Sequence, residues 1–205
     1  MNGDTARGGD TGAYLHHPTI AGDLVVFVCE DDLWTVPAEG GAARRLTAGT
    51  TPCAGPRLSP DGRLVAFTGK PEGVPEICLF SVAEGGPVRR LTARAAARCT
   101  PVGWHPETGE VLYSGTADRP AAFGERVFAV HPDGGPPRLV EAGPAVTLSH
   151  GPEGAVLIGR SLTDPARRKR YRGGAAGELW VDPDGGGFRR LRPDAANPAD
   201  PCWAG

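Results

Sequence analysis

The sequence predicts an all-β fold: a partial β-propeller of about four four-stranded antiparallel blades, followed by the start of a fifth. Two turn motifs recur along the chain, and no segment has the sustained 3.6-residue apolar period that indicates a helix. The composition agrees, because 31 glycines and 21 prolines punctuate short apolar runs instead of forming tracts. We therefore expect many tight turns between short strands and almost no helix.

The first motif is an apolar strand that runs into a glycine pair and returns as a strand ending in Arg-Leu. Its copies are LWTVPAEGGAARRL (33–46), ICLFSVAEGGPVRRL (77–91), VFAVHPDGGPPRL (127–139) and LWVDPDGGGFRRL (179–191). The glycine pairs end at Gly41, Gly86, Gly135 and Gly187, which gives periods of 45, 49 and 52 residues. Glycine takes the positive φ of a hairpin turn, so each copy predicts a hairpin with its leucine buried and its arginines on the outer rim.

The second motif lies between these hairpins and predicts two more strands. Its copies are PRLSPDGRLVAFTG from Pro56, VGWHPETGEVLYSG from Val102 and LSHGPEGAVLIGR from Leu148. In each copy a turn with proline near its start and glycine at its end joins two strands. The two motifs together make four strands per repeat, which is the pattern of a propeller blade. The predicted blades span about 14–47, 54–92, 101–140 and 146–191.

The two ends of the sequence differ from the repeat. Residues 1–13 read as a disordered leader. The last residues, PCWAG (201–205), echo PTIAG (18–22), which precedes a strand in the first blade. We therefore expect a fifth blade that begins at about residue 198 and is cut off. An unclosed arc of blades leaves an apolar face at each end, so the isolated chain is expected to be poorly soluble or to self-associate.

Charge and cysteine content limit the classes of function. The net charge of −2 gives no electrostatic reason to expect nucleic acid or an anionic membrane as a partner, and no apolar run approaches the ~20 residues that span a bilayer. The start of the chain has no apolar segment of the secretory type. Its five cysteines, Cys29, Cys53, Cys78, Cys99 and Cys202, have spacings that suit neither zinc nor a disulfide scaffold. We expect a cytoplasmic protein with reduced cysteines, no metal and no cofactor.

The motif P-x-x-S-P-D-G followed by G-G-x-x-R-R-L-T resembles the repeat of TolB-like proteins, prolyl oligopeptidase relatives and tricorn proteases. Two segments narrow the resemblance to the tricorn protease family. HHPTIAGDLVVFVCEDDLWTVPAEGG (16–41) resembles the first blade of that family, and KRYRGGAAGELWVD (169–182) is similar to its Y-R-G-G-x-x-G-x-[IL]-W segment. The resemblance covers residues 14–205.

The resemblance implies that the chain is part of the N-terminal six-bladed propeller of a large cytoplasmic serine peptidase that degrades oligopeptides. The catalytic residues would lie far downstream, so this part would be non-catalytic and would guide or gate peptide access. Expected partners are peptides and the rest of its own polypeptide, with the parent a homo-oligomer. Two alternatives stay open: a TolB-like protein-binding propeller with no enzyme attached, and the gating propeller of a prolyl-oligopeptidase-like hydrolase.

The strongest local charge lies in RSLTDPARRKRYRGG (160–174). Its candidate functional residues are Arg167, Arg168, Lys169, Arg170 and Arg172. One interpretation is a solvated loop between strands. Another is an anchor for acidic groups such as a peptide carboxylate, because the guanidinium fork pairs with carboxylates in bidentate fashion. Nucleic-acid binding is the weakest interpretation, because Tyr171 alone offers aromatic stacking. Arg94 and Arg98 form a second basic loop, which we expect to face the same channel.

Three other groups suggest chemistry but have simpler explanations. Ser149–His150 is the one Ser-His pair, and its alignment with the other repeats predicts a turn at the end of a strand without a catalytic partner. Glu30, Asp31 and Asp32 are expected to form a solvated acidic turn. His16 and His17 are expected to point to opposite sides of a strand, because side chains alternate along it. The sequence therefore assigns no catalytic residue.

Overall fold

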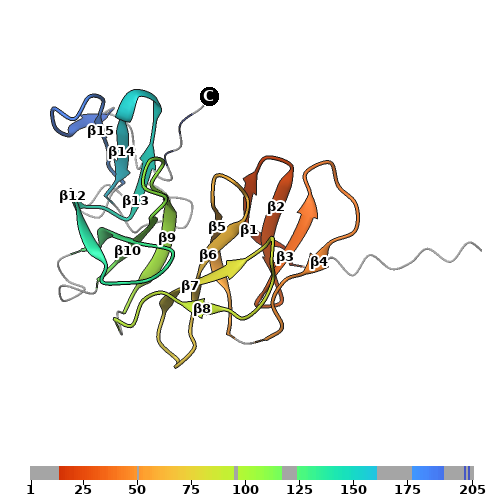
Figure 1. The fold of residues 1–205 in the computed structure, drawn as a ribbon. Coiled ribbons are helices and arrows are strands. Elements are labelled where there is room, and N and C mark those ends of the chain that lie inside the picture. The colour runs from red at the N-terminus through yellow and green to blue at the C-terminus, as the bar shows by residue number, and fades with distance from the viewer. Residues whose placement is uncertain are drawn as a thin grey trace, which may run out of the picture.

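The computed structural model describes residues 14–49, 51–94, 97–116, 124–160, 177–191, 201 and 203. These residues form four separate four-stranded antiparallel sheets, so the predicted all-β fold with four blades is confirmed. Within the described part the only helical element is a short 3-10 turn, η2 (Pro152–Gly154), between two strands. Figure 1 shows the blades following one another from the N-terminal to the C-terminal end of the chain.

Each blade is built from four strands that are consecutive in sequence. Blade 1 consists of β1 (His16–Ala21), β2 (Leu24–Cys29), β3 (Asp32–Pro37) and β4 (Arg44–Arg45), and blade 2 of β5 (Ala54–Leu58), β6 (Leu64–Gly69), β7 (Glu76–Ser81) and β8 (Arg89–Arg90). Blade 3 consists of β9 (Cys99–Trp104), β10 (Val111–Gly115), β11 (Arg126–Val130) and β12 (Arg138–Pro144), and blade 4 of β13 (Thr147–His150), β14 (Val156–Gly159), β15 (Leu179–Asp182) and β16 (Arg189–Leu191). In every blade the strands lie side by side in chain order.

The first strands of successive blades lie next to one another: β1 contacts β5, β5 contacts β9, and β9 contacts β13. These inner strands are joined by side-chain bonds to the backbone. The indole Nε1 of Trp104 donates to the carbonyl oxygen of Arg57 at 3.0 Å, and the amide of Leu58 donates to Oγ1 of Thr19 at 3.2 Å. Polar side chains thus fix the spacing of blades that share no backbone ladder.

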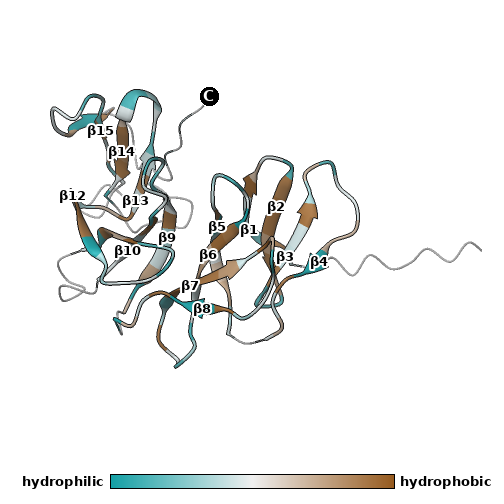
Figure 2. Cartoon of the chain, viewed as in Figure 1, coloured by the Kyte–Doolittle hydropathy of each residue, from teal (hydrophilic) through white to brown (hydrophobic). Residues whose placement is uncertain are grey.

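The apolar runs of the middle strands are nearly continuous because both faces of an inner blade are buried. In β6, Val65 and Phe67 pack in the cluster shared with blade 1, whereas Ala66 packs in the cluster shared with blade 3. In β10, Tyr113 faces blade 2 and Leu112 faces blade 4. Figure 2 shows the middle strands β2, β6, β10 and β14 in brown and the outer strands β4 and β8 in teal. Among the described residues the core therefore consists of three layers, each between two neighbouring blades.

The glycine hairpins form as the sequence predicts. Gly85 and Gly86 have φ of 72° and 98° in the turn between β7 and β8, which L-residues with a side chain rarely adopt. The returning strands β4, β8 and β16 are the outermost strands, and their arginines are exposed. Arg90 and Arg190 pair with Glu72 at 2.9 Å and with Glu178 at 3.3 Å. The Arg-Arg pairs thus decorate the rim, as expected.

Candidate functional site

A cavity of about 470 Å³ lies beside the inner strands of blades 2, 3 and 4. It is lined by Arg57 of β5, by Thr100, Pro101 and Val102 of β9, by Thr147, Leu148 and Ser149 of β13, and by Val146 and Pro201. Its position follows from the fold, because every blade contributes its first strand to the same inner surface. It is the candidate functional site, since a propeller offers its ligands either this inner surface or an exposed end.

The lining of this cavity combines one cation with several hydroxyl groups. Arg57 donates from Nη1 to the carbonyl oxygen of Pro56 at 3.0 Å. Oγ1 of Thr147 is buried, and within the described residues it has no hydrogen-bond partner. A buried hydroxyl without a partner carries a desolvation cost. Arg57 can offer a guanidinium to a carboxylate, and Thr100 and Ser149 can offer hydroxyl groups to the backbone of an extended peptide.

The pair Ser149–His150 forms the end of β13 and so lies in the strand, not in the predicted turn after it. Ser149 lines the cavity, but the His150 ring packs against the ring of His105, with centroids 4.8 Å apart. Nδ1 of His105 accepts from the amides of Glu107 and Thr108, both at 3.3 Å. No hydrogen bond in the described structure joins the Ser149 hydroxyl to a histidine, so the pair has no nucleophile–base geometry.

Acidification should weaken the contact between blades 3 and 4 through this histidine pair. Burial, and then the charge of His105, lower the pKa of His150 below its ordinary value of 6.5, against an opposing effect of Glu107. A base with a lowered folded-state pKa loses stability as the pH falls through its unfolded value toward the folded one. We expect a fall in the melting temperature from about pH 7.5 to about pH 5.5. That fall should be smaller in His150→Gln; an equal fall in both proteins would contradict the assignment.

The expectation for His16 and His17 is wrong. The two side chains converge, with their Nδ1 atoms 2.9 Å apart and ring centroids separated by 4.6 Å. The cause is a register shift in β1 between His16 and Thr19, together with a φ of 53° at His17. The usual alternation of side chains fails at such an irregularity.

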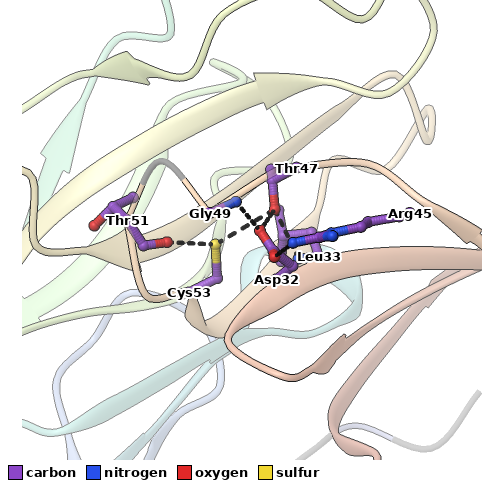
Figure 3. A network of polar contacts seen from close by, with 7 residues as sticks. All are labelled: Asp32, Leu33, Arg45, Thr47, Gly49, Thr51 and Cys53. Atoms are coloured by element: carbon purple, nitrogen blue, oxygen red, sulfur yellow. Dashed lines mark hydrogen bonds and ion pairs between the residues drawn. The ribbon is translucent and has the colours of Figure 1, made fainter.

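The expectation for the acidic run is right for two residues and wrong for the third. Glu30 and Asp31 are exposed in the turn between β2 and β3. Asp32, the first residue of β3, is only 2% exposed. Its Oδ1 accepts from Oγ1 of Thr47 at 2.6 Å and from the amide of Gly49 at 2.9 Å, and its Oδ2 pairs with Arg45 (Figure 3). Asp32 is thus a structural group at the junction of blades 1 and 2.

Blade 2 repeats this network with a longer acid. Glu76 accepts from the hydroxyl of Thr92 and, at 2.9 Å, from the amide of Arg94. In both blades the threonine also accepts an amide of the third strand, from Leu33 in blade 1 and from Ile77 in blade 2, each at 2.9 Å. The sequence carries a signal for both networks: an acid begins the third strand, and Thr follows Arg-Arg-Leu at nearly the same spacing.

Each of these threonines also lies beside a buried thiol of the next blade. Oγ1 of Thr47 is 3.8 Å from Sγ of Cys53, and Oγ1 of Thr92 is 4.0 Å from Sγ of Cys99. Burial raises the pKa of both thiols to about 12. Such thiols are not nucleophiles at neutral pH. Cys29, Cys53, Cys78 and Cys99 are buried free thiols, and Cys202 lies outside the described residues.

The predicted basic loop, with Arg167, Arg168, Lys169, Arg170 and Arg172, lies outside the described residues. It connects β14 to β15, and Gly159, the last residue of β14, pairs with Thr147 of the cavity. The guanidinium of Arg160 at its start lies 3.9 Å from the ring centroid of Trp180.

Arg94 and Arg98 of the second basic loop contact other side chains, and neither of them lines the cavity. Arg98 is 3.6 Å from the buried Glu125, and Arg94 lies over the ring of Phe128 at 5.8 Å. Both arginines therefore belong to the junction of blades 2 and 3.

Comparisons with known proteins agree on one family. Residues 12–205 match the family model described as the tricorn protease N-terminal beta propeller domain. The chain is 40% identical over 195 residues to tricorn protease homolog 1 of Streptomyces coelicolor, covering 94% of this chain but 18% of that protein. It is 27% identical over 199 residues to the tricorn protease of Thermoplasma acidophilum, covering 93% of this chain and 18% of that protein. The chain thus spans about a fifth of the length of these relatives.

A solved structure supports the fold alone. TolB from Acinetobacter baumannii superposes with a TM-score of 0.64 at 14% identity, covering 87% of this chain and 43% of that one. Within the described ranges no helix has the length and apolar character needed to cross a bilayer.

Proposed function

This chain belongs to the family of tricorn protease N-terminal β-propeller domains, and from that membership we propose that it is the non-catalytic propeller of a tricorn-like serine peptidase. Its role would be to guide or gate the access of oligopeptides to an active site outside this chain. The larger protein would be a cytoplasmic hydrolase that assembles as a homo-oligomer. The partners of this chain would be peptides and the rest of its own polypeptide.

The observation that carries this proposal is the cavity at the inner strands. Thr100 of β9 and Ser149 of β13 contribute hydroxyls to it, and Arg57 of β5 contributes a guanidinium. An extended peptide exposes alternating amides and carbonyls, which hydroxyls can satisfy in any sequence. A single cation adds preference for a carboxylate. Such a lining suits passage of many peptides better than selective capture of one.

Two further features support the proposal. The basic residues from Arg167 to Arg172 connect to the strand end at Gly159, which pairs with the cavity residue Thr147. A carboxylate-anchoring role for that loop remains a prediction. In addition, Ile20 of β1 is 64% exposed, a large apolar side chain on the first blade. Contact with the rest of the polypeptide would cover it.

The proposal is tested by fluorescence anisotropy of labelled oligopeptides mixed with the whole chain. We expect saturable, salt-sensitive binding, and no cleavage of the peptides. Arg57→Gln removes the charged hydrogen bonds to a carboxylate, each of which contributes about 1.5–3 kcal/mol. The dissociation constant should therefore rise about tenfold or more. Binding of peptides with an amidated C-terminus should depend less on Arg57.

Arg44→Gln is the matched control, because Arg44 is an exposed arginine of the outer strand β4. It should leave peptide binding unchanged. Neutralising Arg167, Arg168 and Arg170 together tests the basic loop separately. Equal binding by the wild type, Arg57→Gln and the triple variant would overturn the guiding role. Cleavage of peptides by the isolated chain would overturn the non-catalytic assignment.

A further inference from the structure

The histidine pair at the start of β1 departs from regular strand geometry. Two adjacent residues of a regular strand project to opposite faces, yet Nδ1 of His16 and Nδ1 of His17 are 2.9 Å apart. In the protein alone, one of these nitrogens carries the proton that the other accepts. The amide of Gly55 also donates a hydrogen bond to Nδ1 of His17, at 3.5 Å.

The convergence has a conformational cost. His17 has a φ of 53°, in the left-handed region that costs a residue with a side chain about 1 kcal/mol or more. Glycine would adopt this backbone without strain. His17 is exposed, so burial of its ring does not repay the strain. An exposed hydrogen bond between two imidazoles contributes little net stability, because water competes for the same groups.

The distance between the two nitrogens matches a chelate. Imidazole nitrogens bind divalent metals at about 2.0–2.1 Å, so two of them at right angles around one ion lie about 2.9 Å apart. A tetrahedral angle would require a wider separation. Right angles are typical of the square-planar or tetragonal sites of Cu²⁺ and Ni²⁺, whereas Zn²⁺ prefers a tetrahedron. We propose that His16 and His17 form a bidentate site for Cu²⁺ or Ni²⁺.

The surroundings fit a site that is open to solvent. Within the described ranges no third histidine, cysteine or carboxylate joins the pair, so water or an added ligand would complete the coordination. Arg57 lies near enough to His17 for its charge to act on the ring. The positive charge of Arg57 limits affinity, so exchangeable binding is expected. This inference does not depend on the proposed function.

The test is calorimetric titration of the whole chain with Ni²⁺, which does not oxidise thiols. We expect one Ni²⁺ per chain, and loss of this binding in both His16→Gln and His17→Gln. His105→Gln is the matched control, because it removes one member of the other histidine pair and should leave Ni²⁺ binding intact. Zn²⁺ should bind more weakly than Ni²⁺.

A second variant separates metal binding from a structural role of the contact. His17→Gly relieves the backbone strain, so the melting temperature without metal should not fall, whereas the increase that Ni²⁺ causes in the wild type should disappear. The proposal would be overturned if the wild type did not bind Ni²⁺, if either glutamine variant bound Ni²⁺ as tightly as the wild type, or if the wild type bound Zn²⁺ as tightly as Ni²⁺. A lower melting temperature of metal-free His17→Gly would show that the contact serves stability instead.

Discussion

Replacing Asp32 with alanine should lower the free energy of unfolding by about 3 kcal/mol. The substitution leaves the Thr47 hydroxyl and the Gly49 amide without their acceptor at a buried junction, and Arg45 without its partner. In a domain of this size each kcal/mol lowers the melting temperature by about 2–4 °C. Thermal melts followed by circular dichroism would measure the loss. Asp23→Ala is the control, because Asp23 is an exposed carboxylate in the turn between β1 and β2.

The same carboxylate predicts a loss of stability in acid. Burial alone would raise the pKa of Asp32, but the hydrogen bonds from Thr47, Gly49 and Arg45 outweigh it and hold the pKa below its usual value. A lowered folded-state pKa gives stability that is present above the unfolded value and is lost as the pH falls toward the folded one. The difference in stability between wild type and Asp32→Ala should therefore shrink below about pH 4. A difference that stays constant with pH would contradict a role for the charge.

Replacing Phe67 with alanine should cost about 3–5 kcal/mol, the largest effect that we expect in the core. Phe67 is fully buried in the cluster between blades 1 and 2, where it packs with Val28 and Leu33. Strands from both blades fix the walls of the resulting cavity, so collapse around it is limited. We expect the denaturation midpoint to fall without a large change in the m-value, because the surface exposed on unfolding stays similar.

Phe188→Ala is the matched control for this cavity. Phe188 is only partly buried, and it packs at the edge of the cluster between blades 3 and 4. The same deletion of a ring should therefore cost clearly less there. Equal losses at the two positions would mean that the layer between blades 1 and 2 is not closely packed.

The fold was predictable because its information is local and repeated. A glycine hairpin and a proline-glycine turn each specify two strands, and four copies of the first with three of the second leave little choice of architecture. The pairing of strands was also predictable, because strands that follow one another in sequence pair with one another in each blade. Burial on both faces was equally visible, as the continuous apolar run of β6 shows.

The site was less predictable, for particular physical reasons. Asp32 looks like its exposed neighbours Glu30 and Asp31, and only the distant Thr47 decides that it is buried and paired. His16 and His17 violate strand alternation because of an irregularity that no turn residue announces. The cavity unites Arg57 with residues of two later blades, and a repeat pattern gives no sign of which inner residues differ.

The acid–threonine networks imply that the boundary of the repeating sequence unit does not coincide with the edge of a blade. Each network joins the third strand of one blade to the connection that enters the next, as from Asp32 to Gly49 and from Glu76 to the amide of Arg94. A segment that starts at one acid and ends just before the next acid would therefore contain a complete network. It would also enter the next segment with the same backbone geometry. Gene duplication or deletion at those points could lengthen or shorten the array by one blade and still leave a complete network at the junction between the neighbouring blades. The unit of inheritance in such an array would then be half of one blade and half of its successor.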